Sequence, residues 1–270
     1  MANLSRLSLN QITVEQWSIA ETVEACVRHQ IGSIALWRYG IADTGLQRCV
    51  QLVRNAGLHV TSVCRGGMFP ASEPAERKRR IEDNLRAIDE AAELDADCLV
   101  LVTGADPKVS LCDARAMVKD GIEEIAPYAR VRGVRLGVEP LHPLFAGDRS
   151  VINTIDQAME IVNQYPAELL GIVLDVIHIW WDPRLEALVD SCRGRIMGFH
   201  VSDWPVPIPD PVKCRAMMGD GVIDIPGIRQ MVEQAGYMGP IEVEILNQAI
   251  WDTPCEEVVT QMMERFETVV

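Results

Sequence analysis

The sequence lacks an excess of basic residues and has no long apolar run. Its 39 acidic residues outnumber its 25 lysines and arginines, which gives a formal net charge of −14. That charge argues against nucleic acid as a partner, because binding a phosphate backbone needs a basic face. No run of roughly 18 apolar residues occurs, so we expect no membrane span. Residues 1–6 also lack the apolar segment of a secretory signal.

Several short motifs are absent as well. None of the eight cysteines lies in a Cys-x-x-Cys pair, and several sit inside apolar runs, so we expect reduced, buried thiols and a cytoplasmic location. No Gly-x-Gly-x-x-Gly follows the first expected strand, so nothing predicts a dinucleotide site. No glycine loop that would cradle a phosphate is evident either, which favours a non-phosphorylated substrate.

Segments of strand and helix character alternate along all 270 residues, 48% of which are hydrophobic. The strand-like segments are short and apolar, which is typical of strands buried on both faces. Eight such units, each followed by a helix, predict a (β/α)8 TIM barrel with one domain over residues 1–270. A doubly wound open sheet is the alternative, but it rarely needs eight regular units. The expected strands are 7–10, 33–37, 59–64, 98–103, 135–139, 170–175, 196–201 and 241–244.

Capping patterns predict where some helices begin. Thr13 and Gln16 have the spacing of a capping box, in which the first side chain and the fourth each bind the other's backbone N–H. Thr253 and Glu256 have the same spacing near the end of the chain. We therefore expect helices to start at both places.

Four consecutive expected strands end in a side chain that can bind a metal. In a barrel these ends meet at one face, where active sites lie. One such acid alone could equally cap a helix or pair with an arginine, but four in succession favour a shared site. Three carboxylates with one imidazole suit Mn²⁺, Mg²⁺ or Co²⁺ better than a structural zinc site, which would prefer thiolates. The four residues are Glu139, Asp175, His200 and Glu244.

Glu242 competes with Glu244 for the place on the eighth strand. The two residues are two positions apart on a strand, so their side chains point to the same side. The later position lies nearer the strand end, which favours Glu244.

These pieces resemble the xylose isomerase-like TIM barrel superfamily, and within it the sugar (phosphate) isomerase/epimerase group. The resemblance covers the second half of the chain, whereas the first half matches only in its alternation of strands and helices. The matching motifs are Gly137-Val-Glu139-Pro, Leu174-Asp175-x-x-His178, His200-Val-Ser-Asp203, Gly219-Asp-Gly221-x-Ile-Asp224 and Gly236-Tyr-Met-Gly239-Pro-Ile-Glu-Val-Glu244.

The resemblance implies one divalent metal ion, Mn²⁺ first and Mg²⁺, Co²⁺ or Zn²⁺ as alternatives, held by Glu139, Asp175, His200 and Glu244. It also implies that Glu139 and Glu244 move a proton on opposite faces of a sugar substrate through an enediolate. A homo-oligomer, either a dimer or a tetramer, is typical of the group. The later position of Glu244 also agrees with the family pattern.

Other residues near the strand ends are candidates for substrate binding. By the resemblance, His178 hydrogen bonds a substrate oxygen beside the metal, and Arg215 grips a substrate oxygen or phosphate. His142, three residues after Glu139, could line the same opening. A local loop contact is the alternative for His178, and a surface position is the alternative for Arg215.

Further candidates come from tryptophans and from residues beside the strand ends. Trp37 and four later tryptophans suit the CH faces of a sugar but equally suit a role as core plugs. Arg65 ends the third strand and could reach an anionic substrate. Asp203 is expected to orient His200 or a group on the ligand side.

The leading functional hypothesis is a divalent-metal-dependent isomerase or epimerase of a sugar or sugar derivative. The alternative on the same scaffold is a lyase, by inosose dehydration or by β-elimination from a keto-glycoside. A DNA-repair activity like that of endonuclease IV would need a histidine-rich trinuclear zinc site, and this chain has only five histidines. A non-catalytic sugar-binding protein is disfavoured because the ligand set is complete.

Overall fold

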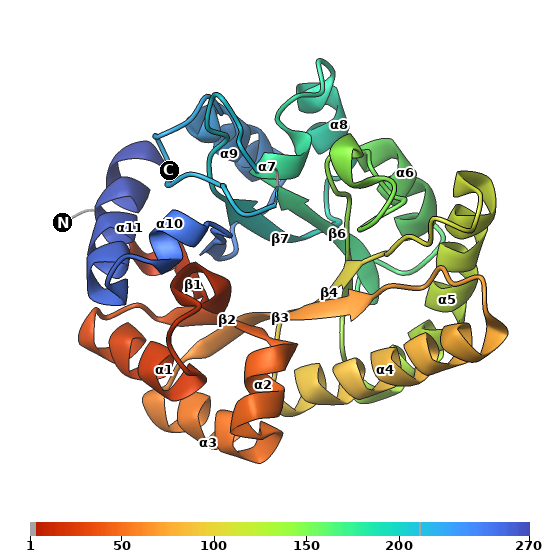
Figure 1. Cartoon of the computed structure of the whole chain (residues 1–270), viewed down its shortest axis with the longest axis horizontal. Helices are drawn as coiled ribbons and strands as arrows, with labels where there is room; N and C mark the ends of the chain where they lie inside the picture. Colours follow the sequence, from red (N-terminus) through yellow and green to blue (C-terminus); the bar gives the residue numbers. More distant parts are fainter. Residues whose placement is uncertain (1–3, 211) are drawn as a thin grey trace.

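Eight parallel strands close into a barrel in a computed structural model that describes residues 4–210 and 212–270. The strands follow one another around the barrel in chain order, with helices outside the ring (Figure 1). The expected TIM barrel is therefore confirmed, and the open sheet is not formed. The strands are β1 (Leu7–Asn10), β2 (Ser33–Trp37), β3 (His59–Gly67), β4 (Cys98–Val102), β5 (Leu136–Glu139), β6 (Leu170–Asp175), β7 (Ile196–Val201) and β8 (Ile241–Val243).

The helices fall into two groups. Long ones cover the outside of the barrel, whereas short ones follow directly after strands, as α2 does after β2 and α7 after β6. The helices are α1 (Ile19–Arg28), α2 (Arg38–Thr44), α3 (Leu46–Ala56), α4 (Pro74–Glu93), α5 (Leu111–Arg132), α6 (Ile155–Val162), α7 (Val176–Ile179), α8 (Leu185–Ser191), α9 (Ile225–Gln234), α10 (Gln248–Trp251) and α11 (Cys255–Val269). Three 3₁₀ turns are η1 (Leu4–Arg6), η2 (Gln11–Val14) and η3 (Pro143–Phe145).

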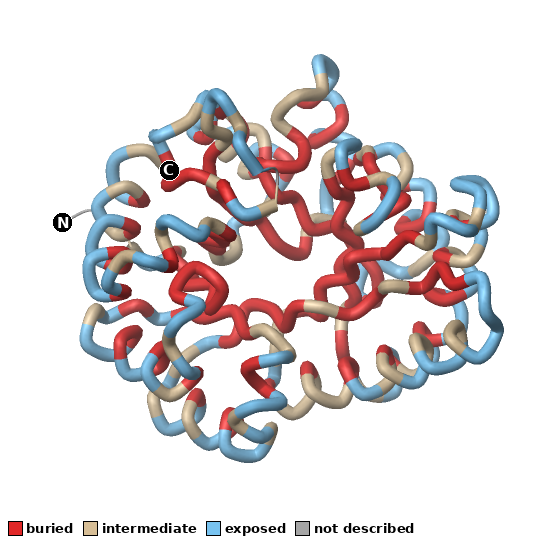
Figure 2. The backbone as a smooth tube through the Cα atoms, in the orientation of Figure 1, coloured by how far each residue is buried: buried red, intermediate tan, exposed pale blue. Residues whose placement is uncertain are grey.

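Nearly all strand residues are buried, because the strands are covered on both faces, and β4 and β6 accordingly are apolar almost throughout. In β4, Leu99 and Leu101 join the large core between strands and helices. Cys98 and Val100 point the other way and pack in a smaller cluster within the barrel. Figure 2 shows the buried backbone concentrated in the ring of strands, with exposed backbone on the outer helices.

The expected capping box at Thr13 is wrong. Helix α1 begins five residues later, where the Ser18 and Glu21 side chains each bind the other's backbone N–H. Thr13 is fully buried instead: its hydroxyl donates to the Val243 carbonyl at 2.8 Å and accepts the Ile245 N–H at 3.0 Å. The local pattern predicted that Thr13 caps a helix, but its side chain is instead buried against the end of β8.

The second expected capping box, at Thr253, is also wrong. Helix α11 begins after Pro254, and no side chain caps its first turn. The Thr253 hydroxyl instead donates to the Ala249 carbonyl one turn earlier in the chain.

All eight cysteines are free thiols, and seven of them are buried. Within residues 4–210 and 212–270, no helix has both the length and the apolar character that crossing a bilayer requires.

Candidate metal centre

The structure brings the four expected metal ligands together at one end of the barrel. Glu139 and Asp175 are the last residues of β5 and β6, His200 is near the end of β7, and Glu244 directly follows β8. Asp175 and His200 are paired across neighbouring strands, so they lie at the same level. Each of the four offers a ligand atom, and these atoms lie within 4.8 Å of one another.

The chemistry of this set fits a divalent cation. All four side chains are buried. Within the described part of the chain, Glu139 Oε1 and both ring nitrogens of His200 have no hydrogen-bond partner of good geometry. Buried polar atoms without partners are rare in folded proteins, and three carboxylates in one buried place need a positive charge between them. The group can therefore bind a metal ion.

Glu242 pairs with His200 across β7 and β8 and contacts the other side of its ring. Its Oε2 is 3.2 Å from His200 Nε2, and Glu242 also accepts hydrogen bonds from Thr61, Ser62 and Asn10. Nδ1 of His200 faces the ligand set, 3.6 Å from Glu139 Oε1 and 3.7 Å from Glu244 Oε2. A carboxylate behind a ligating imidazole fixes which nitrogen faces the metal.

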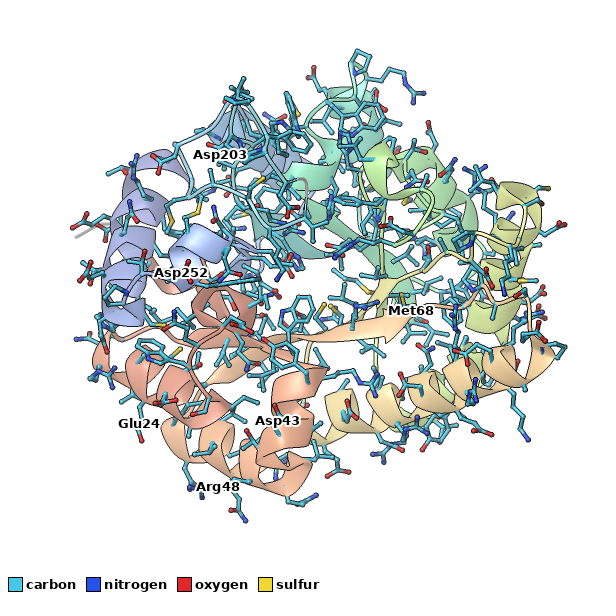
Figure 3. The ribbon with its side chains drawn as sticks, in the orientation of Figure 1. Glu24, Asp43, Arg48, Met68, Asp203 and Asp252 are labelled. Atoms are coloured by element: carbon cyan, nitrogen blue, oxygen red, sulfur yellow. The ribbon has the colours of Figure 1, made fainter. Side chains whose placement is uncertain are left out.

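Asp203 does not orient His200, contrary to expectation. Its carboxylate accepts backbone N–H groups from Trp204, Gly219, Gly221 and Ile223 at 2.8–3.0 Å. A Cβ at Gly221 would lie 2.4 Å from the Asp203 carboxylate, so only glycine allows this approach. Asp203 therefore shapes the long loop after β7, and Figure 3 labels it within that loop.

The same loop inserts Arg215 among the ligands. Arg215 Nη1 donates to Glu244 Oε2 at 2.7 Å and to Asp175 Oδ2 at 2.9 Å. Its backbone is held at the end of β8, because its N–H donates to the Leu246 carbonyl and its carbonyl accepts from Asn247. Arg215 is thus fixed beside the candidate metal position and is not a surface arginine.

Burial and charge shift the pKa values of these groups. Burial raises the pKa of Glu139 and raises that of Asp175 to about 7. Burial acts in the same direction on Glu244, but Arg215 and His200 outweigh it and lower the pKa. Burial disfavours the charged form of His200, yet the surrounding carboxylates raise its pKa well above the usual value. A cation with two charges would favour the ionised carboxylates here.

A cavity of about 400 Å³ opens above the ligand set. Glu139 and Glu244 line it, as do three of the expected substrate-binding residues, Trp37, His178 and Arg215. The fourth, His142, packs instead against Trp181 and Trp204, with ring centroids 5.6 and 5.0 Å away. Its Nδ1 accepts the Leu144 N–H, so His142 is held by a local loop contact.

Two residues that contribute to the site were not identified from the sequence. Asn10 donates to Glu242 and Glu244 and accepts from the Trp37 indole N–H. Its position at the end of β1 is the same signal that identified the ligands. Arg149 lines the cavity from the loop before α6, and no motif marks it.

Comparisons with known proteins agree with this geometry. Residues 20–268 match the family described as xylose isomerase-like TIM barrel. The chain belongs to this family. A crystal structure of a protein from Sinorhizobium meliloti 1021 is 43% identical, with a TM-score of 0.96 and 99% of each chain covered. A structure of the IOLI protein with a bound zinc atom has a TM-score of 0.84 over 98% of each chain, but at 19% identity it shows only the shared fold.

Curated members of the family carry different activities. 3-Dehydroshikimate dehydratase of Pseudomonas aeruginosa is 31% identical over 189 residues, which are 66% of this chain but only 28% of that protein. The chain thus spans well under a third of the length of this relative. Other relatives are named inosose isomerase and L-ribulose-5-phosphate 3-epimerase. Isomerases, epimerases and dehydratases therefore all occur among the homologues.

Proposed function

We propose that this protein is a divalent-metal-dependent isomerase or epimerase of a sugar or sugar derivative. The observation that carries the proposal is the buried ligand set of Glu139, Asp175, His200 and Glu244 at the floor of a cavity large enough for a small polyol. We propose Mn²⁺ as the bound ion, with Mg²⁺, Co²⁺ and Zn²⁺ as alternatives, because oxygen ligands predominate. When bound, the ion would polarise a substrate carbonyl and so acidify the neighbouring carbon.

In this proposal Glu139 and Glu244 move the proton. Both line the cavity, and Glu139 Oε1 has no hydrogen-bond partner in the described part of the chain. One carboxylate removes the proton from the carbon beside the carbonyl. In an isomerase a proton returns to the former carbonyl carbon while the hydroxyl proton moves to the former carbonyl oxygen, and exchange with solvent before the return lets deuterium enter. In an epimerase the other carboxylate returns a proton to the opposite face of the same carbon.

The remaining cavity residues would position the substrate. Arg215 and His178 are buried beside the ligand set, with Arg215 Nη2 3.4 Å from His178 Nε2, and both can contact a substrate oxygen. Trp37 gives an aromatic wall whose orientation is fixed by Asn10. His142 lies further out, among tryptophans that would face a larger substrate.

Dehydration is a second candidate, favoured by the two relatives at 30–31% identity, which are both named 3-dehydroshikimate dehydratase. The first step is the same proton removal. The electrons of the C–H bond then form a C=C bond as the neighbouring C–O bond breaks, and the hydroxyl group leaves as water with one added proton.

Incubation of the Mn²⁺-loaded protein with ketone substrates in D₂O tests the proposal. D-Fructose, inosose and 3-dehydroshikimate form a suitable panel, followed by mass spectrometry. We expect one of them to take up deuterium, and Glu139→Gln to slow this uptake by about 100-fold or more, the usual contribution of a general base. Glu124→Gln, at an exposed position of α5, is the control.

The mass of the product separates the two candidates. Isomerisation and epimerisation conserve the mass apart from deuterium, whereas dehydration removes one water. If Glu139→Gln exchanges deuterium at the wild-type rate, the proton-transfer role of Glu139 is wrong.

We also propose that the chain folds as one domain, resides in the cytoplasm and forms a homo-oligomer, either a dimer or a tetramer. The eight free thiols support a reducing compartment. Light scattering on purified protein tests the oligomer, and a single elution mass equal to one chain would reject it.

A further inference from the structure

Two arginines in the cavity wall have no acidic partner. Arg65 and Arg149 both line the cavity and are half-buried, yet neither guanidinium makes an ion pair or hydrogen bond with any residue that the structure describes. Elsewhere, partly buried arginines are paired, as Arg38 is with Asp83 and Glu90. Holding an arginine away from bulk water without a partner is unfavourable, so such a site is suited to an incoming anion.

Arg65 owes its position to an irregularity in β3. Cys64 pairs with Val100 and Gly66 with Leu101, so Arg65 is an extra residue without a partner on β4. A bulge of this kind redirects a side chain at the end of a strand. Arg65 and Cys64 therefore both line the cavity, although neighbouring residues of a regular strand point to opposite faces.

Arg149 reaches the same cavity from the loop before α6. Its carbonyl accepts the Gly104 N–H at 3.0 Å, and its own N–H donates to the Phe145 carbonyl at 3.1 Å. The guanidinium carbon lies 5.7 Å from the centre of the Phe145 ring. Burial and the positive charges of Arg65 and Arg215 lower the pKa of Arg149, while Asp148 and Asp210 act in the opposite direction.

The charges of the cavity leave these two arginines uncompensated. A bound divalent cation together with Arg215 would offset the carboxylates of the ligand set. The acids that then remain near Arg65 and Arg149 are Asp148, which lines the cavity, and Asp210, which acts on Arg149 from the loop after β7. The chain as a whole has a net charge of −14, so a positively charged cavity would attract an anionic ligand to this one place.

We propose that the substrate carries an oxyanion group, a carboxylate or a phosphate, and that Arg65 and Arg149 bind it in the more exposed part of the cavity. This inference rests on the proposed function, because it takes the cavity to be the substrate site. Two guanidinium groups can each donate paired hydrogen bonds to such a group. A neutral sugar could accept hydrogen bonds from both arginines but would offer no negative charge to balance them.

Isothermal titration of the Mn²⁺-loaded protein with small probes tests the inference. The probes are cyclohexanecarboxylate, methyl phosphate and the neutral cyclohexanecarboxamide. We expect Arg65→Gln and Arg149→Gln each to weaken binding of the favoured anion about ten-fold, as for a lost charge-assisted hydrogen bond. Because a bound cation also attracts anions, the comparison with these variants decides the result.

The control is Arg48→Gln. Arg48 is exposed and has no ion pair among the described residues, and Figure 3 shows it on the outer side of α3, away from the barrel. We expect this variant to bind every probe as the wild type does. The melting temperature should stay unchanged in Arg48→Gln and should change little in the two cavity variants, where only the contact of Arg149 with the Phe145 ring is lost.

The tighter of the two anions identifies the group that the substrate carries. If both cavity variants bind both anions as tightly as the wild type, the inference is wrong. The proposed function is tested separately: Glu139→Gln should abolish deuterium exchange while keeping the preference for an anion. Exchange into a neutral ketose without any anion preference would leave the function standing and reject this inference.

Discussion

His200 and Glu242 form the residue pair that sets the geometry of the candidate metal centre. The carboxylate of Glu242 lies 3.2 Å from Nε2, so the opposite nitrogen faces the ligand set. We predict that Glu242→Gln lowers Mn²⁺ affinity about ten-fold and that Glu242→Ala lowers it by up to about 100-fold, the usual range for such partners. Competition titration with a fluorescent chelator measures this.

Glu124→Gln serves as the matched control, because it removes one carboxylate from the surface of α5. Wild-type affinity in both Glu242 variants would show that His200 needs no partner to bind the metal.

The sequence only partly separated the metal ligands from the residues that hold those ligands in place. Glu242 and Glu244 share a face of β8, as their spacing predicted, and both are buried. Their different contacts follow from register, since Glu242 pairs with His200 and Glu244 lies beyond the last paired residue. The role of Asp203 was predicted wrongly, because its hydrogen-bond partners lie in a loop whose path cannot be predicted from a local sequence pattern.

At the scale of elements, Asn84 joins α4 to the end of β3. Its buried side chain accepts the Gly67 N–H at 2.6 Å and donates to the Gly67 carbonyl at 2.7 Å. We predict that Asn84→Ala lowers the free energy of unfolding by about 1–3 kcal/mol, because it leaves two buried backbone groups without partners. Urea denaturation measures the loss.

Asn55→Ala, at an exposed site on α3, should change that free energy by less than about 0.5 kcal/mol. Equal stability of the Asn84 variant and this control would contradict the assigned role.

The loop from Asp203 to Ile223 depends on one carboxylate. We predict that Asp203→Ala exposes the backbone N–H groups of Gly219, Gly221 and Ile223 to faster hydrogen exchange, because each donates to Asp203. Mass spectrometry of peptides from this loop measures the exchange. Asp252→Ala, at an exposed position after α10, should leave the same peptides unchanged. If Asp203→Ala does not change the hydrogen exchange of these peptides, Asp203 is not what stabilises the loop.

The strands could be predicted because short apolar segments that alternate with helical segments along a whole chain are typical of the strands of a barrel. Helix starts were less predictable. Thr13 and Ser18 both begin a plausible capping box, and only the burial of Thr13 against β8 decides between them. Arg65 was expected to reach an anionic substrate from the end of the third strand, although the register shift that turns it into the cavity could not be predicted. Arg149 could not be placed from the sequence, because a loop brings it to the cavity.

At the scale of the whole molecule, metal binding should stabilise the fold. The ligand carboxylates repel one another unless a cation lies between them, and a ligand that binds only the folded state raises stability by mass action. We predict that Mn²⁺ at about 100 times its dissociation constant adds about 2.7 kcal/mol to the free energy of unfolding. Thermal melting with Mn²⁺ and after exhaustive chelation measures this, and identical melting temperatures would contradict it.

The central claim is that four strand ends bind one divalent cation. Anomalous scattering from a crystal soaked in Mn²⁺ tests it most directly. The account predicts one strong peak bonded to Glu139, Asp175, His200 and Glu244. A soaked crystal with no peak among these four side chains, or with its only peaks elsewhere, would contradict it.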